Sequence, residues 1–264
     1  MKIRTFDPDL KSGLGNIERI KNLVNKNTKL IFLSHITCTT GQVIPIKEIG
    51  ELAKENNIWF AIDGAQAVGS MPIDIKNYHI DFYTFSGHKW TLGPKRTGVL
   101  YVNKDRLDIL QPITVGAYSD NGYDIQKGDL KFQPSAQRYE FGTQNEAVFM
   151  GMGTGAEFIQ TIGLQRVWEH NRQLAELFYN GLMNISEAEL LSPKEEKYRS
   201  AIISFKIKGK DYQDVASYLT GKKRIRVRVV GEAGLNGIIV SFHVYNNANE
   251  VEKILEEIRN FIKS

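Results

Sequence analysis

Two groups of polar residues stand directly after short apolar runs, where a strand would end. Asp63 follows the run Ile58–Ile62 (IWFAI), and Lys89 closes the segment Asp81–Lys89 (DFYTFSGHK). In an open α/β sheet, ligands bind at the carboxyl ends of strands. A lysine partly shielded from water at such a place loses basicity and can form a Schiff base with a carbonyl group. A carboxylate there is costly unless it meets a cation.

The same residues match the needs of pyridoxal phosphate. This cofactor takes a lysine for its covalent attachment and an acid for its ring nitrogen, which Lys89 and Asp63 would supply. Ser86 and His88 carry hydrogen-bond donors suited to the phosphate group. Two plainer interpretations stay open. Asp63 could cap the helix that follows it, and Lys89 could be a loop lysine surrounded by water.

The first half of the chain alternates apolar runs with one amphipathic segment. The segment Pro45–Asn57 (PIKEIGELAKENN) places its apolar residues on one face of a helix and has a proline in the first turn. Strand, helix and strand joined by short links are typical of a mostly parallel α/β sheet. The predicted strands are Lys29–Ser34, Ile58–Ile62, Asp81–Ser86 and Gly98–Val102.

The second half changes pattern. Residues 115–136 show no hydrophobic period, which favours a long surface or active-site loop. Residues 146–183 are predicted to be helical with a break near Gly163. Strands mixed with amphipathic helices then favour a small α+β domain that starts near residue 155. The expected strands are Ala201–Ile207, Ile225–Val230 and Gly237–Phe242, and the expected helices are Asp211–Leu219 and Asn249–Ile262.

Composition excludes several classes of protein. The 264 residues are 42% hydrophobic and 24% charged, as in an ordinary soluble globular protein. No apolar run could span a bilayer, and the first ten residues lack a secretory core, so we expect a cytoplasmic protein. The net charge of +4 does not argue for nucleic acid. The single cysteine, Cys38, excludes an intrachain disulfide and a cysteine-built metal cluster.

Four segments together resemble the class V aminotransferases, which are fold-type I pyridoxal-phosphate enzymes. The order and spacing of these segments match the family along essentially the whole chain. The family includes cysteine desulfurases, selenocysteine lyases, kynureninases and isopenicillin-epimerase-like proteins, and Ser34–Ile46 most resembles the last branch. The four segments are Ile62–Gln66 (IDGAQ), Asp81–Lys89 (DFYTFSGHK), Glu140–Asn145 (EFGTQN) and Ser241–Asn246 (SFHVYN).

The resemblance implies a role for each matched residue around the cofactor. Lys89 would be the Schiff-base lysine and the proton shuttle at the substrate's α-carbon. Asp63 would pair with the pyridine nitrogen, and Gln66 would hydrogen-bond the phenolic oxygen of the ring. Ser86 and His88 match phosphate ligands.

The resemblance also implies a homodimer with shared sites. Gly142 and Thr143 match a segment that reaches the phosphate bound by the neighbouring subunit. Cys38 lies where relatives often carry Asn or Ser near the cofactor, and its plainer interpretation is a small, partly buried residue. The implied fold is a cofactor-binding large domain over residues 1–154 and a small α+β domain over residues 155–264.

The sequence departs from the family in three places. Nothing before Lys29 matches the turn and the stacking residue that relatives supply from the first part of the large domain, so we expect that domain to be N-terminally incomplete. Desulfurases carry a persulfide-forming cysteine in a loop that matches Val230–Gly237, which has none, so a persulfide-type desulfurase is disfavoured. Ile239 replaces an arginine that clamps the substrate carboxylate, and Arg228 could compensate.

The sequence therefore predicts a pyridoxal-phosphate enzyme that acts at the α-carbon of a small amino acid or related amine. Lyase, epimerase or aminotransferase chemistry is expected, with no metal. The alternative is an inactive or half-site protein that needs a partner chain carrying the missing N-terminal segment.

Overall fold

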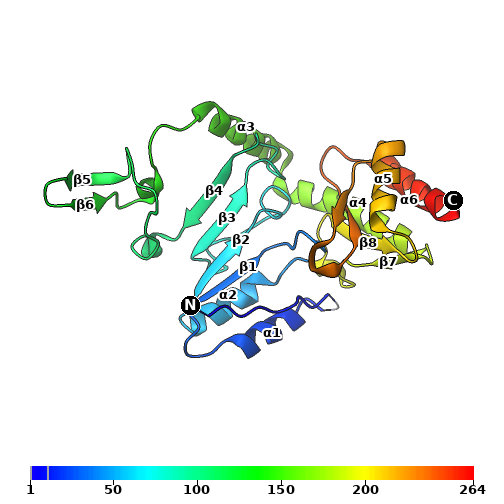
Figure 1. The fold of residues 1–264 in the computed structure, drawn as a ribbon, viewed down its shortest axis with the longest axis horizontal. Helices are drawn as coiled ribbons and strands as arrows, with labels where there is room; N and C mark the ends of the chain where they lie inside the picture. Colours follow the sequence, from blue (N-terminus) through cyan, green and yellow to red (C-terminus); the bar gives the residue numbers. More distant parts are fainter. Residues whose placement is uncertain (1, 11) are drawn as a thin grey trace.

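The computed structural model describes residues 2–10 and 12–264, and Figure 1 shows two sheets joined by helices. The larger sheet has the order β1-β2-β3-β4, in which β1, β2 and β3 are parallel and β4 is antiparallel to β3. The prediction of a mostly parallel α/β sheet is confirmed. Its strands are β1 (Leu30–Ser34), β2 (Trp59–Asp63), β3 (Phe82–Ser86) and β4 (Gly98–Val102).

Two helices cover one face of this sheet. They are α1 (Gly15–Leu23), which the sequence analysis did not predict, and α2 (Ile46–Glu55), and both lie below the sheet in Figure 1. The apolar face of α2 is buried through Ile49 and Ala53, which share a core with Phe60 and Ile62 of β2. This apolar face holds α2 against the sheet.

The second sheet is smaller and wholly antiparallel, with the order β7-β8-β10-β9. The helices α4 and α6 pack on it around a core that includes Phe178, Ile203 and Ile254. The predicted boundary between residues 154 and 155 falls inside α3 and stays a prediction. These elements are α3 (Glu146–Ile162), α4 (Leu164–Met183), β7 (Ala188–Leu190), β8 (Ile202–Ile207), α5 (Tyr212–Ser217), β9 (Arg228–Val230), β10 (Gly237–Ser241) and α6 (Ala248–Lys263).

Residues 115–136 are not the structureless loop that the sequence predicted. They form a hairpin of β5 (Asp120–Asp124) and β6 (Asp129–Phe132), which projects from the large sheet (Figure 1). The strands show no hydrophobic alternation because neither buries a face. Short 3-10 turns occupy Lys104–Arg106, Ala136–Tyr139, Glu196–Tyr198 and Glu232–Gly234, and a wider helical turn occupies Tyr218–Lys222.

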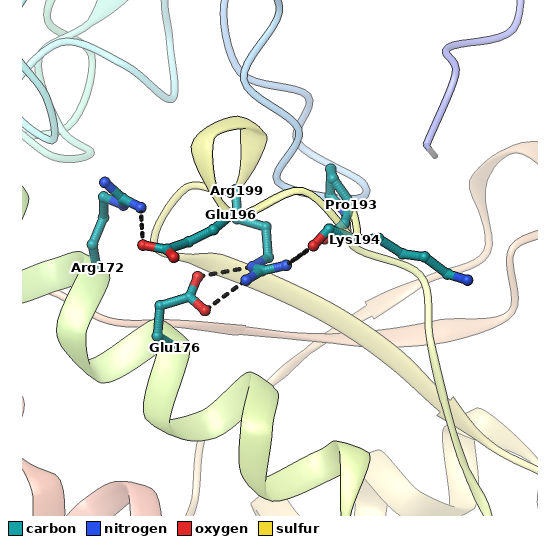
Figure 2. A network of polar contacts seen from close by, with 6 residues as sticks. All are labelled: Arg172, Glu176, Pro193, Lys194, Glu196 and Arg199. Atoms are coloured by element: carbon teal, nitrogen blue, oxygen red, sulfur yellow. Dashed lines mark hydrogen bonds and ion pairs between the residues drawn. The ribbon is translucent and has the colours of Figure 1, made fainter. Parts of the chain in front are cut away.

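A buried arginine fixes the segment between β7 and β8, which contacts the loop after β1. Both guanidinium edges of Arg199 are engaged (Figure 2). Its Nε and Nη2 donate to the two carboxylate oxygens of Glu176 at 2.8 and 2.6 Å, and its Nη1 donates to the carbonyls of Pro193 and Lys194. The guanidinium also lies 3.8 Å from the ring centre of Tyr179. This bidentate geometry favours one placement of the segment over α4.

The segment held by Arg199 in turn holds the loop that follows β1. Ser192 Oγ donates to the carbonyl of Thr40 at 2.7 Å, and Ser200 N donates to the carbonyl of Gly41 at 3.0 Å. Gly41 has φ of 69°, and a Cβ there would lie 1.9 Å from the carbonyl oxygen of Ile202. The loop over residues 37–43 therefore takes its shape from the small sheet as much as from β1.

Replacement of Arg199 by Met should destabilise the fold strongly. The variant keeps the length of the side chain but leaves the Glu176 carboxylate without its partner. Removal of one member of a buried pair costs about 3 kcal/mol in the free energy of unfolding, which urea unfolding followed by circular dichroism would measure. The matched control is Arg172→Met, whose partner Glu196 is mostly exposed, and its cost should stay below about 1 kcal/mol. Equal losses in the two variants would contradict the prediction.

Candidate active site

The carboxyl ends of the three parallel strands lie level, and this brings the predicted polar residues to one edge of the sheet. Asp63, the last residue of β2, is in register with Ser34 of β1 and Thr84 of β3. Ser86 ends β3, and Lys89 follows three residues later. The parallel arrangement therefore places Asp63 in the middle of the edge, with the loop of Lys89 beside it.

Asp63 is a half-buried carboxylate whose charge is not neutralised by a cationic side chain in the described residues. Its Oδ1 accepts a hydrogen bond from Ala65 N at 2.9 Å, so the side chain is also the cap of the turn that follows. No ion pair joins it to a lysine, arginine or histidine of residues 2–10 or 12–264. A carboxylate in this state suits a ligand that brings its own positive charge, such as a protonated pyridine ring.

Two neutral groups lie beneath Asp63. His35, which is 2% exposed, forms a hydrogen bond of 2.9 Å between its Nδ1 and the hydroxyl of the fully buried Tyr83. Burial lowers the pKa of His35 to about 4. Burial, and after it the charge of Asp63, raises the pKa of the Tyr83 hydroxyl. Both groups are therefore uncharged at neutral pH, and neither competes with a ligand for Asp63.

The amide of Gln66 has a fixed orientation. Trp90 Nε1–H donates to Gln66 Oε1 at 2.9 Å. An indole N–H can only donate, so the oxygen of the amide must face Trp90. The Nε2 group of Gln66 is then the one left to donate to a ligand oxygen. This agrees with the phenolic-oxygen contact expected for Gln66, and that role stays a prediction.

The loop that carries Lys89 is a compact turn. The carbonyl of Gly87 accepts from Gly93 N at 2.8 Å and from Thr91 Oγ1 at 2.7 Å, and Gly87 N donates to Thr97 O at 2.9 Å. A Cβ at Gly87 would lie 2.4 Å from Thr97 Oγ1, so this position requires glycine. Lys89 is half-buried and His88 is exposed. The backbone before and after Lys89 is thus held without use of the lysine side chain.

The chain does not bring every predicted residue to this edge. Gly142, with φ of 122°, and Thr143, which is exposed, lie in the segment before α3, and no described contact joins them to the loop of Lys89. They would serve a site only on another subunit, as predicted, and that role stays a prediction.

Arg228 and Ile239 are directly paired across β9 and β10. Ile239 is a core residue, packed in one cluster with Trp90, and does not line the site. Arg228 Nη1 donates to the carbonyl of Cys38 at 3.0 Å, and its guanidinium forms an ion pair with Glu232. Cys38 is exposed in the turn after β1. Arg228 therefore lies beside the loop over residues 37–43.

Within the described residues, no helix is long and apolar enough to cross a membrane. No group of three or more His, Cys, Asp or Glu side chains in the same residues could hold a metal ion.

Comparisons with known proteins agree on one family. The model of the family described as Aminotransferase class-V matches residues 1–254, and the chain belongs to this family. A "Probable cysteine desulfurase" of Pyrococcus abyssi is 31% identical over 273 residues, which are 100% of this chain and 67% of that protein. The apo structure of a cysteine desulfurase from Thermococcus onnurineus has a TM-score of 0.88 at 29% identity, covering 99% of this chain and 66% of that one.

A further similar structure is the cystine C-S lyase C-DES, solved with its reaction product cysteine persulfide. It has a TM-score of 0.82 at 25% identity, covering 91% of this chain and 63% of that one. A variant of C-DES has been solved with glycine covalently linked to its pyridoxal-phosphate cofactor. The resemblance, the fold class and the pyridoxal-phosphate class of enzyme are thereby confirmed. The chain spans about two thirds of the length of the relatives that it matches.

One prediction was wrong. The sequence analysis disfavoured a persulfide-type desulfurase because residues 230–237 contain no cysteine, yet the relatives that match the whole chain are named cysteine desulfurases. The product named for C-DES is the persulfide of free cysteine, a small molecule. The absence of a cysteine from one loop is therefore no argument against sulfur chemistry, and similarity along the whole chain carries more weight.

The buried His35 should make stability depend on pH. An unfolded histidine takes up a proton below pH 6.5, whereas folded His35 does so only near pH 4. Its contribution is therefore complete above pH 6.5 and is lost as the pH falls toward 4, by about 2 kcal/mol at pH 5.

This effect can be measured with His35→Gln, which keeps a polar partner for Tyr83 but does not titrate. The free energy of unfolding from urea denaturation should fall between pH 7 and pH 5 by about 2 kcal/mol less in the variant than in the native chain. Identical slopes for the two proteins would overturn the assignment.

Proposed function

We propose that this chain binds pyridoxal phosphate and takes part in the removal of sulfur from cysteine or a closely related amino acid. One observation carries the proposal. Asp63, a half-buried carboxylate with no cationic partner among the described residues, and the half-buried Lys89 stand at one edge of the large sheet. Relatives of the chain are named cysteine desulfurases. The substrate class is taken from the names of the relatives, and the residue roles are those that the family resemblance implies.

Each residue at the edge has a task in this proposal. When bound, the cofactor supplies a ring that accepts electrons from the substrate's α-carbon. Lys89 anchors the cofactor aldehyde and moves a proton at that carbon. Asp63 keeps a proton on the ring nitrogen, and Gln66 Nε2 donates to the phenolic oxygen. Ser86 and His88 donate to the phosphate, with Cys38 beside the cofactor.

The substrate carboxylate needs a cation at the entrance. Arg228 contacts the loop over residues 37–43 through the Cys38 carbonyl, and its other partner is the exposed Glu232. A bidentate carboxylate would replace Glu232 as the partner of its guanidinium. Arg228 is therefore the proposed ligand of the substrate carboxylate, in place of the family arginine whose position Ile239 occupies.

Lys89→Ala should abolish covalent attachment of the cofactor. The protein is incubated with pyridoxal phosphate, reduced with borohydride, denatured and weighed intact. The native chain should gain the mass of the reduced cofactor, and the variant should not. Sulfide release from L-cysteine with added dithiothreitol should fall by about a hundredfold or more. Lys95→Ala, which removes an exposed lysine of the same loop region, should match the native chain in both measurements.

A further segment of polypeptide is proposed to cover β1. Leu30 and Phe32 are exposed on the face of β1 opposite the buried Ile31, and β1 is an edge strand. Relatives are about half as long again, so a segment equivalent to their remaining third is the natural occupant.

If the native chain gains cofactor mass only when that segment is added, the covering segment is required. If Lys89→Ala gains the same mass, the role of Lys89 is wrong.

We further propose a homodimer that uses the exposed face of α3. This helix is apolar in composition, yet Phe149, Met150 and Phe158 are exposed, as is Phe141 in the segment before it. Exposed apolar surface of this kind marks an interface. Gly142 and Thr143 adjoin the same surface in the chain, and a second copy seated there would bring them toward another site.

Met150→Glu should weaken this dimer. A carboxylate at a buried interface loses its hydration, so the midpoint of dissociation should rise by about tenfold or more in protein concentration. Light scattering across a dilution series measures it. The control Met183→Glu makes the same change at a side chain of similar exposure on α4, 64% against 74% for Met150. A native chain that is monomeric throughout the series would refute the dimer.

A further inference from the structure

His243, which lies just after the last strand residue of β10 in the small sheet, is buried against the loop of the proposed cofactor lysine. It follows β10 and is 3% exposed. Its Nε2 lies 3.0 Å from the carbonyl oxygen of Trp90, and its ring meets the Trp90 ring edge-on with centres 5.2 Å apart. These two residues are 153 positions apart in the chain, so the contact links the two sheets.

The partners of His243 determine where its proton lies. A carbonyl oxygen only accepts, so Nε2 carries the hydrogen that is donated to Trp90. Nδ1 must then accept, and Asn171 Nδ2 donates to it at 3.2 Å. Burial lowers the pKa of His243, which keeps this neutral form at neutral pH. Both ring nitrogens are thus used, one toward the large sheet and one toward α4.

The amide of Asn171 is an unusual partner. Asn171 is completely buried, and its Oδ1 has no hydrogen-bond partner in the described residues. A buried amide oxygen without a partner costs free energy, so the residue is not explained by stability alone. Its Nδ2 group is the feature that the arrangement uses, because it locks the imidazole in the form that donates to Trp90.

Trp90 connects His243 to two residues of the candidate site. Its backbone continues directly from Lys89, and its indole N–H fixes the amide of Gln66. The peptide group of Trp90 is also enclosed on its far side, because a Cβ at Gly69 would lie 2.5 Å from the Trp90 carbonyl. A shift of the Trp90 carbonyl would therefore move both Lys89 and Gln66.

We propose that His243 and Asn171 are positioning residues, which set Lys89 and Gln66 through Trp90. The small sheet thereby controls the geometry of a site that is built on the large sheet. The proposal rests on the proposed role of Lys89 as the cofactor lysine. Neither His243 nor Asn171 is assigned a contact with cofactor or substrate.

Two substitutions of His243 separate positioning from simple packing. His243→Phe keeps an aromatic ring against Trp90 but removes the donor to its carbonyl. His243→Gln gives up the ring but keeps an N–H donor. We expect the affinity for pyridoxal phosphate, measured by absorbance titration, to fall by about tenfold in His243→Phe and to recover in His243→Gln. The pH midpoint of the cofactor's absorbance band should shift in the first variant and return in the second.

A second measurement needs no cofactor. In a chain with Trp59→Phe and Trp168→Phe, all tryptophan emission comes from Trp90. Its intensity should change with pH as His243 takes up a proton, and His243→Phe should remove this transition. Asn171→Asp, which places a carboxylate beside the imidazole, should move the transition to higher pH by about one unit or more. His170 and Tyr245, the other titratable groups beside His243, are kept in all variants.

The outcomes distinguish the two proposals. If the native chain binds no cofactor even when the proposed covering segment is added, while the emission of Trp90 follows His243, the proposed function fails and the contact stands. If the native chain binds cofactor but His243→Phe changes neither the affinity nor the absorbance midpoint, the positioning role is overturned. If the affinity for pyridoxal phosphate recovers in His243→Gln while the unfolding midpoint of that variant is lowered, stability and affinity change separately. Loss of fold is then excluded as the cause of the weaker binding in His243→Phe.

Discussion

The candidate site depends on a half-buried carboxylate, Asp63, at the end of the middle parallel strand. Asp63 lies near His35 and Tyr83, two groups that burial keeps neutral. No cationic side chain in the described residues forms an ion pair with Asp63. The register of β1, β2 and β3 makes the arrangement possible, because it brings three loops to the same edge. The proposed role of Asp63 toward a protonated pyridine ring depends on this arrangement.

The loops at this edge are held from outside the large sheet. The loop after β1 takes its hydrogen bonds from residues 192–200, which Arg199 fixes over α4. The loop of Lys89 is held through Trp90 by His243. The large sheet therefore carries the proposed reactive side chains, and elements of the small sheet hold the backbone of their loops. A change in the position of the small sheet would be felt at both loops together.

The sequence predicted those features whose signal is local. Five-residue apolar strands ending in polar groups predicted the large sheet and the position of Asp63 and Lys89. The hairpin β5–β6 escaped notice because it buries no face, and the His243 contact escaped because its partners are 153 residues apart. For His35, the signal in the sequence was its position directly after the apolar strand that ends at Ser34. The expectation that disfavoured a persulfide-type desulfurase was wrong, because it gave a missing cysteine more weight than similarity along the whole chain.

The uncovered face of β1 has a practical consequence for work with these residues alone. Phe32 is 64% exposed and Leu30 lies two positions before it, on a strand that has no neighbouring strand on its outer edge within the described residues. Such an edge is a template for pairing between copies. A preparation of this chain should therefore self-associate through β1 as its concentration rises. Such particles would consist of native molecules joined edge to edge, and dilution would disperse them.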